Sequence, residues 1–411
     1  MKRAFRVFLV LVCIFVMGSI GLWHYAKQTQ GTQASAKLSE SKKVQRILEK
    51  KAVKVQAKTK VSQKPVNTPV PKVEEVSLLA VGDNLIHSQI IRDGNRGNGK
   101  YDFNHLYDGI RSDVKKADYA VINQETILGG TKLGCSGYPR FNSPTQVGDA
   151  VVKAGFNIVL HATNHSMDRG EVGMQNSLNY WKTKKGVTVL GANKSQTERN
   201  TIRIVNKNGI RIAMLNYTFS LNGLPMPKDR RYMVDLLEEN KVKADIEKAK
   251  KESDFIIVFP HWGTEYMLKP VAYQKKWASI FLDAGVDLVI GAHPHVVEPI
   301  EWMKREDGHK MLVYYSLGNY ISSQTDMARM LGGMAKLTIK KKGDEHAYID
   351  KANVTPIVTH IHNGHYTVYK LKNYSESLAR VHKLRVRGTS FSKAGLEALA
   401  SQVFGKWRSD R

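Results

Sequence analysis

Five short apolar runs in this chain each end at residues that can bind a metal ion. The run at 286–290 leads into the sequence Gly-Ala-His-Pro-His at 291–295. A β-branched apolar run that ends in glycine predicts a buried strand followed by a loop. If that loop stays extended, His293 and His295 point to the same side, and Pro294 between them stiffens it. Two histidines in one loop are weak evidence, so the other four run endings decide the interpretation.

The other four apolar runs, at 76–81, 119–122, 157–160 and 255–259, end in the same way. Their endings carry Asp83, Asn123 with Glu125, Asn164 with His165, and His261. Segments predicted to be helical separate the strands, at 106–116, 144–154, 171–184, 234–251 and 272–284. Alternating strands and helices predict a largely parallel sheet, with the loops after the strands gathered at one edge.

The second half of the chain adds hairpins to this pattern. Turn sequences Asn208-Gly209 and Asp307-Gly308 each lie between two apolar runs. Alternating residues from Gly333 to about Tyr369 predict further antiparallel strands. The predicted fold class is therefore α/β with α+β elements.

Carboxylates, amide oxygens and imidazoles together form the ligand set of a two-metal hydrolase. These ligands suit Mn, Zn or Fe. Two metals about 3.5–4 Å apart need a shared ligand, and such a pair generates hydroxide near neutral pH and clamps a phosphoryl group. A carboxylate is the best bridge.

The order of these residues resembles the calcineurin-like metallophosphoesterases, and within them the CapA/PgsA family of capsule (poly-γ-glutamate) biosynthesis proteins. The resemblance covers about residues 76–322. It rests on six motifs in order: Val81-Gly82-Asp83, Asn123-Gln124-Glu125, Asn164-His165-Ser166-Met167-Asp168, His261-Trp262-Gly263-Thr264-Glu265-Tyr266, Gly291-Ala292-His293-Pro294-His295 and Ser316-Leu317-Gly318-Asn319-Tyr320. It implies a layered αββα sandwich of the metallophosphoesterase type.

The resemblance also implies ligands for each metal. Asp83 and His295 would bind the first metal, and Glu125 would bridge the two, with Asn123 nearby as a further ligand. His261 and His293 would bind the second metal.

Asn164 and His165 are the implied catalytic residues. Asn164 would bind the second metal and orient the scissile phosphoryl oxygen. His165 would be the general acid or contact the phosphate.

The sequence departs from the wider phosphoesterase pattern at three places. Leu85 stands where a histidine is expected two residues after the first aspartate, and His87 is displaced from it. Thr163 replaces the usual glycine, and the second acidic motif is Asn-x-Glu. The first metal site is therefore one ligand short, and the sequence allows either a single metal ion or an unusual pair.

Four residues within or next to the motifs have simpler explanations. Asp168 and Arg169 are expected to cap the following helix. Glu265 and Tyr266 are expected to shape the pocket or to orient His261.

Three histidines near the end of the chain form a second candidate cluster. His360, His362 and His365 alternate on one side of a predicted strand. No carboxylate accompanies them in the sequence, so we interpret them as structural or surface residues. Glu298 is expected either to order the His-Pro-His loop or to lie on the surface.

The N-terminus predicts a membrane anchor. Residues 8–23 are apolar except for Ser19, close to the ~17-residue minimum for crossing a bilayer, and Lys2, Arg3 and Arg6 place the N-terminus in the cytoplasm. An uncleaved anchor is favoured over a signal peptide, because the small-residue sequence at 34–36 lies well beyond the apolar run. Cys13 falls in the anchor and Cys135 is alone, so the exported part forms no internal disulfide. Sparse cysteines fit a Gram-positive-like envelope.

Composition and the resemblance together divide the chain into four expected regions. Residues 1–26 are a cytoplasmic tip and transmembrane anchor, and residues 27–75 are a Lys-rich flexible spacer. Residues 76–370 form the metallophosphoesterase-like domain, and residues 371–411 form a basic C-terminal tail. The formal charge is +26, with much of it in the spacer; it holds the spacer against anionic polymer or membrane, or it merely keeps a linker soluble.

Two classes of function remain. The first is a membrane-anchored extracellular metallohydrolase of capsule or poly-γ-glutamate biosynthesis or export. The second is a non-catalytic subunit of a capsule synthesis and export complex that binds the anionic polymer. Membrane synthetase or export subunits are candidate partners in both. Nucleic acid is not an expected partner, because the charge sits in the spacer and no basic patch is interleaved with aromatic residues.

Overall fold

The computed structural model describes residues 72–410. The predicted anchor and nearly all of the predicted spacer lie outside these residues. Among the described residues, none of the helices combines the length and the apolar character needed to cross a bilayer. The first strand begins at Val73, three residues before the predicted start of the domain.

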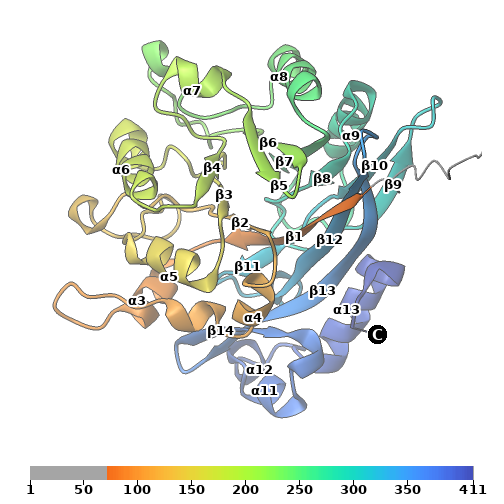
Figure 1. Ribbon diagram of the computed structural model, residues 1–411. Coiled ribbons are helices and arrows are strands. Elements are labelled where there is room, and N and C mark those ends of the chain that lie inside the picture. Colours follow the sequence, from red (N-terminus) through yellow and green to blue (C-terminus); the bar gives the residue numbers. More distant parts are fainter. Residues whose placement is uncertain (1–71, 411) are drawn as a thin grey trace, which may run out of the picture. The chain divides into compact units, whose positions relative to one another are not determined.

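Two mixed sheets form the centre of the described structure (Figure 1). The first has the order β14 (His365–Lys370), β13 (Tyr348–His362), β12 (Leu331–Lys342), β1 (Val73–Asn84), β2 (Tyr119–Asn123), β3 (Ile158–Leu160) and β4 (Thr188–Leu190), and β11 (Asn319–Ile321) pairs with β1. The second has the order β5 (Arg203–Lys207), β6 (Ile210–Thr218), β7 (Phe255–His261), β8 (Leu288–Ile290), β10 (Lys310–Tyr314) and β9 (Ile300–Lys304). Strands β1 to β4 run parallel, as do β6, β7, β8 and β10, whereas β12 to β14 and both hairpins are antiparallel. This confirms the predicted mixture of α/β and α+β elements.

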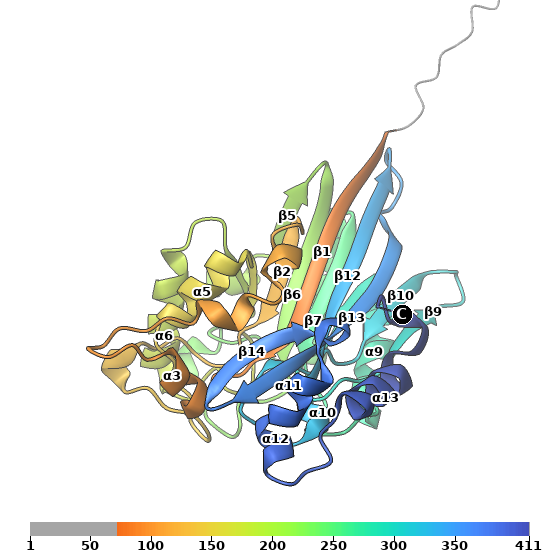
Figure 2. The ribbon, with the colours of Figure 1, turned by 90° about the horizontal axis from the view of Figure 1, so that it is seen from below.

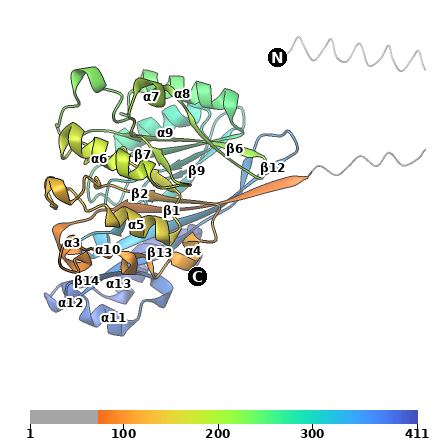
Figure 3. The same ribbon diagram turned by 60° about the vertical axis from the view of Figure 1, so that its left-hand side comes forward.

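Residues of the second sheet alternate between two apolar cores, as side chains on a strand must. Ile212 and Met214 of β6 face the core that the second sheet shares with the first. Ala213 and Leu215 face the opposite side, where they pack with helices α8 (Glu239–Glu252) and α9 (Ala272–Ala284). The two sheets therefore pack face to face, and helices cover the outside of the second (Figure 3).

The outer side of the first sheet is covered by the remaining helices (Figures 2 and 3). These include α3 (Ser88–Gly94), α4 (Arg111–Val114), α5 (Gln146–Ala154), α6 (Gly170–Lys182), α10 (Met327–Met330), α11 (Glu376–Val381), α12 (Lys383–Val386) and α13 (Lys393–Phe404); α7 (Gln196–Asn200) is a short helix after β4. The segment from 371 onward is helical, and Leu396 and Phe404 of α13 are buried in the main core.

Two predicted helices have different bounds in the structure. The predicted helix 106–116 is broken into a 3₁₀ turn (Asn104–Tyr107) and α4. The break falls at Gly109, and glycine is a poor helix former. Gly109 packs so closely on the backbone of Val368 that no side chain fits there. The predicted helix 234–251 begins only at Glu239. Residues Asp235 and Leu237 are extended instead, and their backbones bond to Thr218 at the end of β6.

Candidate metal centre

All five predicted strand endings meet at one edge of the two sheets. Parallel β1, β2 and β3 place their carboxyl ends together in the first sheet, and β7 and β8 do so in the second. A bridge between His261 and Ala292 holds the endings of β7 and β8 side by side. Every predicted site residue is buried there, with at most 6% of its surface exposed: Asp83, Asn123, Glu125, Asn164, His165, His261, His293 and His295.

Asp83 joins the two sheets. Its Oδ2 lies 3.0 Å from Nδ1 of His295, and its Oδ1 accepts a hydrogen bond of 2.7 Å from Nδ2 of Asn123. The same amide nitrogen of Asn123 lies 3.3 Å from Nδ1 of His261. Asn123 thus holds a carboxylate and an imidazole of the predicted ligand set in place, while its own Oδ1 has no hydrogen-bond partner among the described residues.

Glu125 lies at the centre of the cluster. Its Oε1 is 3.7 Å from Nε2 of His261 and 3.6 Å from Nε2 of His295. The residue is fully buried, yet neither carboxylate oxygen accepts a hydrogen bond from residues 72–410. A buried carboxylate without partners is rare, since desolvating it is costly.

The His-Pro-His loop is not extended, which corrects the predicted geometry. His293 and His295 have φ angles of 99° and 58°, in the left-handed region that non-glycine residues seldom adopt. Such strain persists where the surrounding structure enforces it, and it clusters at functional sites. Both rings nevertheless reach the cluster: the His293 ring lies 4.9 Å from that of His261, and His293 Nδ1 has no partner among the described residues.

Asn164 and His165 border the cluster from the loop after β3. The Oδ1 atom of Asn164 lies 2.9 Å from Nε2 of His261. The Nδ1 atom of His165 lies 2.8 Å from Oδ2 of Asp168, which also accepts a hydrogen bond from the backbone of Phe141. Asp168 is therefore not a helix cap, contrary to the prediction; helix α6 has Arg169 at its N-cap and no side-chain capping bond. The three-residue spacing between His165 and Asp168, which can bring two side chains together in one turn, is the sequence signal that could have indicated this pair.

Burial and the neighbouring charges set the protonation of the cluster. Burial raises the pKa of Glu125 well above its usual value, and the charges of Asp83 and Glu265 add to this effect while His295 opposes it. Burial, with His293 and His295 nearby, lowers the pKa of His261 well below its usual value. For His295, burial alone would lower the pKa, but Glu125 and Asp83 outweigh it and raise the pKa to about 9.

The ligand atoms form two triplets that share one carboxylate. Glu125, His261 and His293 form one triplet, and Asp83, Glu125 and His295 form the other; within each, the ligand atoms lie within 4.8 Å of one another. Because the unpartnered buried atoms of Glu125, His293 and Asn123 belong to this cluster, the residues fit divalent metal.

Two further residues belong beside the predicted set. The Glu265 carboxylate forms a third triplet with His293 and His295, although the sequence suggested only a supporting role. His87 and His165 both pack edge-to-face on Phe141, with ring centres 5.2 and 4.6 Å from its ring. Glu298 is buried and accepts a hydrogen bond of 2.6 Å from Nε2 of Gln274, which excludes the surface alternative.

Two curated relatives of this chain are named as capsule biosynthesis proteins. It is 32% identical to the PGA biosynthesis protein CapA of Bacillus subtilis over 207 residues, which are 50% of this chain and 51% of that protein. It is 28% identical to the capsule biosynthesis protein CapA of Bacillus anthracis over 260 residues, 61% of each chain. The chain thus spans between half and two thirds of the length of these relatives.

Solved structures show more distant likeness. An NAD nucleotidase of Haemophilus influenzae has 14% identity and a TM-score of 0.46, covering 80% of this chain and 67% of that one. A 5′-nucleotidase precursor of Thermus thermophilus has 12% identity and a TM-score of 0.42, covering 80% of this chain and 59% of that one.

The model of the family described as bacterial capsule synthesis protein PGA_cap matches residues 77–324, which contain all eight predicted site residues. This confirms the resemblance drawn from the six motifs: the chain belongs to the PGA_cap family of bacterial capsule synthesis proteins.

Proposed function

We propose that this protein binds one or two divalent metal ions (Mn, Zn or Fe) in a metallophosphoesterase-type αββα sandwich and serves the synthesis or export of an anionic capsule polymer. The observation that supports this proposal most directly is that the Glu125 carboxylate is buried without a hydrogen-bond partner among the described residues. Asp83 and the imidazoles of His261, His293 and His295 surround it. A cation between Glu125 and these groups supplies the missing partner.

The ligands divide between two positions. Asp83 and His295 belong to the first, His261, His293 and Asn164 to the second, and Glu125 to both. Glu265 lies near His295 of the first position and His293 of the second, and it could supply a ligand where Leu85 leaves the resembled pattern one short. Bound there, a metal supplies Lewis acidity and lowers the pKa of a water ligand.

His165 and Asp168 supply the proton chemistry. The hydrogen bond from His165 Nδ1 to Asp168 fixes the ring, so Nε2 is the atom that exchanges a proton with substrate. With Nδ1 held by this carboxylate, Nε2 is the atom left to act as a general acid or to contact the phosphate. Asn164, beside His261, is placed to orient the group that reacts.

The cellular setting is part of the proposal. The basic and apolar residues 1–26 would anchor the chain in the cell membrane with the folded domain outside, joined by the 27–75 spacer. The names of the Bacillus relatives support a capsule or poly-γ-glutamate substrate. A formal charge of +26 suits a polyanionic polymer, and membrane synthetase or export subunits are the proposed partners.

The test is metal content of the purified full-length chain, measured together with Mn-dependent hydrolysis of a generic phosphodiester. Asp83→Ala and His293→Ala should each lower both quantities. His346→Ala, which removes a half-exposed histidine paired with Asp287 elsewhere, is the matched control and should change neither.

Three outcomes separate the alternatives. Metal with turnover supports the hydrolase, whereas metal without turnover supports a non-catalytic subunit that binds the polymer. Absence of metal, or full metal content in both site variants, overturns the proposed centre.

A further inference from the structure

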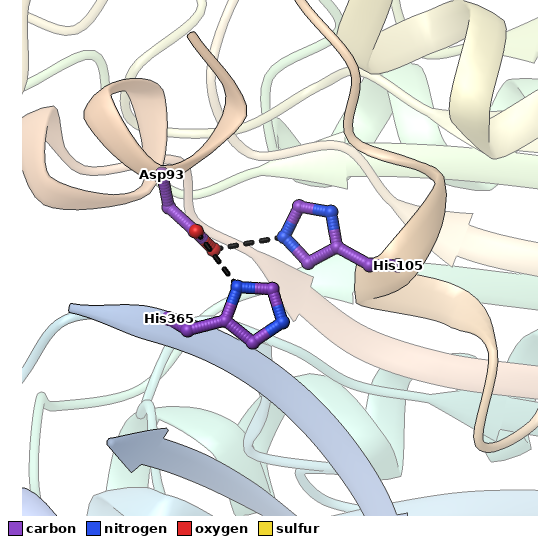
Figure 4. Close-up of side chains that lie close together, drawn as sticks. All are labelled: Asp93, His105 and His365. Atoms are coloured by element: carbon purple, nitrogen blue, oxygen red, sulfur yellow. Dashed lines mark hydrogen bonds and ion pairs between the residues drawn. The ribbon is translucent and has the colours of Figure 1, made fainter. Parts of the chain in front are cut away.

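A second cluster of ligand-type side chains lies away from the proposed centre (Figure 4). Asp93 comes from the last turn of α3, His105 from the 3₁₀ turn Asn104–Tyr107, and His365 from the start of β14. The three residues are up to 272 positions apart in sequence, so only the fold brings them together. They are not needed for the proposed function, and the inference stands apart from it.

Both imidazoles point at the one carboxylate. Nε2 of His105 lies 2.8 Å from Oδ2 of Asp93, and Nδ1 of His365 lies 2.9 Å from Oδ1. The two rings stack with their centres 4.6 Å apart. The backbone N–H of Tyr366 donates to Oδ2 of Asp93 over 2.9 Å, which fixes the carboxylate from behind.

We propose that Asp93, His105 and His365 bind a divalent cation of the zinc class, with an open position that takes a carboxylate or phosphate group. Two imidazoles and one carboxylate with a fourth position free are a donor set that zinc accepts. Zinc–ligand bonds of about 2.0–2.1 Å in a tetrahedron place ligand atoms about 3.3 Å apart. The present 2.8 and 2.9 Å need only a small side-chain adjustment to reach that spacing.

The surroundings explain why the fourth ligand should be an anion. Asp93 and His365 line a cavity of about 670 Å³ that Arg92, Lys383 and Arg387 also line. These three cations form no ion pair with any carboxylate within residues 72–410. One carboxylate leaves a bound divalent ion with a net positive charge, and the three cations add to it, so an anionic group entering the cavity is attracted by both.

The competing explanation is that Asp93 simply accepts two imidazole N–H groups and needs no metal. The experiment is therefore zinc binding by the full-length chain carrying Asp83→Ala and His293→Ala, which silences the first centre. One equivalent of zinc is expected to remain bound in this background. If the proposed function is wrong, this equivalent of zinc should still bind at Asp93, His105 and His365. A failure of the first centre can therefore be told apart from a failure of this second site.

The decisive variant is His365→Ala, added to that background. The His365 side chain is 55% exposed, so its removal should leave the fold intact. Loss of an outer-shell partner alone costs about 10–100-fold in metal affinity, and loss of a ligand should cost at least about 100-fold. Asp93→Asn should lower the zinc affinity to the same extent. His362→Ala, an exposed histidine lining the same cavity, is the matched control and should bind zinc as the background does.

Co²⁺ in place of zinc supplies the second readout. Its visible absorption should report imidazole ligation, and it should change when acetate or inorganic phosphate is added; comparison of the two anions identifies which group is preferred. Unchanged zinc affinity in both His365→Ala and Asp93→Asn overturns the metal site. A Co²⁺ spectrum indifferent to both anions overturns the anionic fourth ligand.

Discussion

Nδ1 of His295, in the loop after β8, lies 3.0 Å from Oδ2 of Asp83 at the end of β1. The two residues are 212 positions apart and belong to different sheets. The contact closes the edge at which the proposed metal ligands gather. Because Glu125 lies on the other side of the His295 ring, this imidazole stands between two buried carboxylates.

Metal binding should therefore release a proton from His295. In the metal-free protein its raised pKa, about 9, keeps the ring charged at neutral pH. The charged ring stabilises the folded protein fully at pH values below about 6.5, the pKa of histidine in the unfolded chain. This stabilisation is lost as the pH rises through about 9, the pKa in the folded protein. A metal needs the neutral ring, so affinity should rise about tenfold per pH unit between these values.

Calorimetry in buffers of different ionisation enthalpy measures this proton. The wild-type heat of metal binding should depend on the buffer, and His295→Gln should reduce that dependence. Heats that are equal in all buffers would contradict the proposed protonation of His295.

Glu125→Gln should remove metal binding and stabilise the metal-free protein. Burial raises the pKa of this carboxyl, so ionising it opposes folding as the pH rises above the unfolded value near 4.5. A neutral amide of the same shape avoids this penalty, on the order of 1–3 kcal/mol at neutral pH, while His295 keeps Asp83 as its hydrogen-bonded carboxylate. Denaturant unfolding with and without metal measures both effects. Glu252→Gln, at an exposed position on α8, is the control. If the metal-free Glu125→Gln protein is instead less stable than the wild type, the Glu125 carboxylate has a hydrogen-bond or ion-pair partner in the folded protein.

Asp168→Asn should leave metal content unchanged and reduce phosphodiester hydrolysis by about 100-fold or more, if the protein turns over. The reason is that Asp168 positions His165 and lies outside the ligand triplets. Asp149→Asn, which removes a half-exposed carboxylate paired with Lys184, should change neither quantity. Loss of metal in Asp168→Asn would instead place this residue among the groups that hold the metal.

Glu298→Gln should stabilise the protein at alkaline pH. Burial raises the pKa of Glu298 to about 8, although the hydrogen bond from Gln274 opposes this. A carboxyl with a raised folded pKa costs stability as the pH rises from about 4.5 to about 8, and the cost stays above that value. The substitution should therefore gain on the order of 1–3 kcal/mol at pH 9 and little at pH 4.

Unfolding free energies at both pH values, with exposed Glu306→Gln for comparison, test this prediction. An equal effect at the two pH values would rule out titration of Glu298 as the cause.

Some interactions were invisible in the sequence because they join distant segments. The turn Asn363-Gly364 separates His362 from His365, so these histidines lie on two strands rather than one, and Asp93 supplies the carboxylate that the local sequence lacks. Likewise, the partner of Glu298 is Gln274 of α9, and Gly109, where the predicted helix 106–116 is broken, packs against the backbone of β14.

The sequence by itself determined the strands, their order along the chain and the candidate ligand residues at their ends. Apolar periodicity and turn residues are local properties, and parallel strands necessarily bring their carboxyl ends to one edge. Only the tertiary structure decided that Glu125 stays without a hydrogen-bond partner among the described residues, that Asp168 holds His165, and that His293 and His295 adopt left-handed backbone angles. Those outcomes depend on how two sheets pack, and packing sets burial, hydrogen-bond partners and strain that no short stretch of sequence contains.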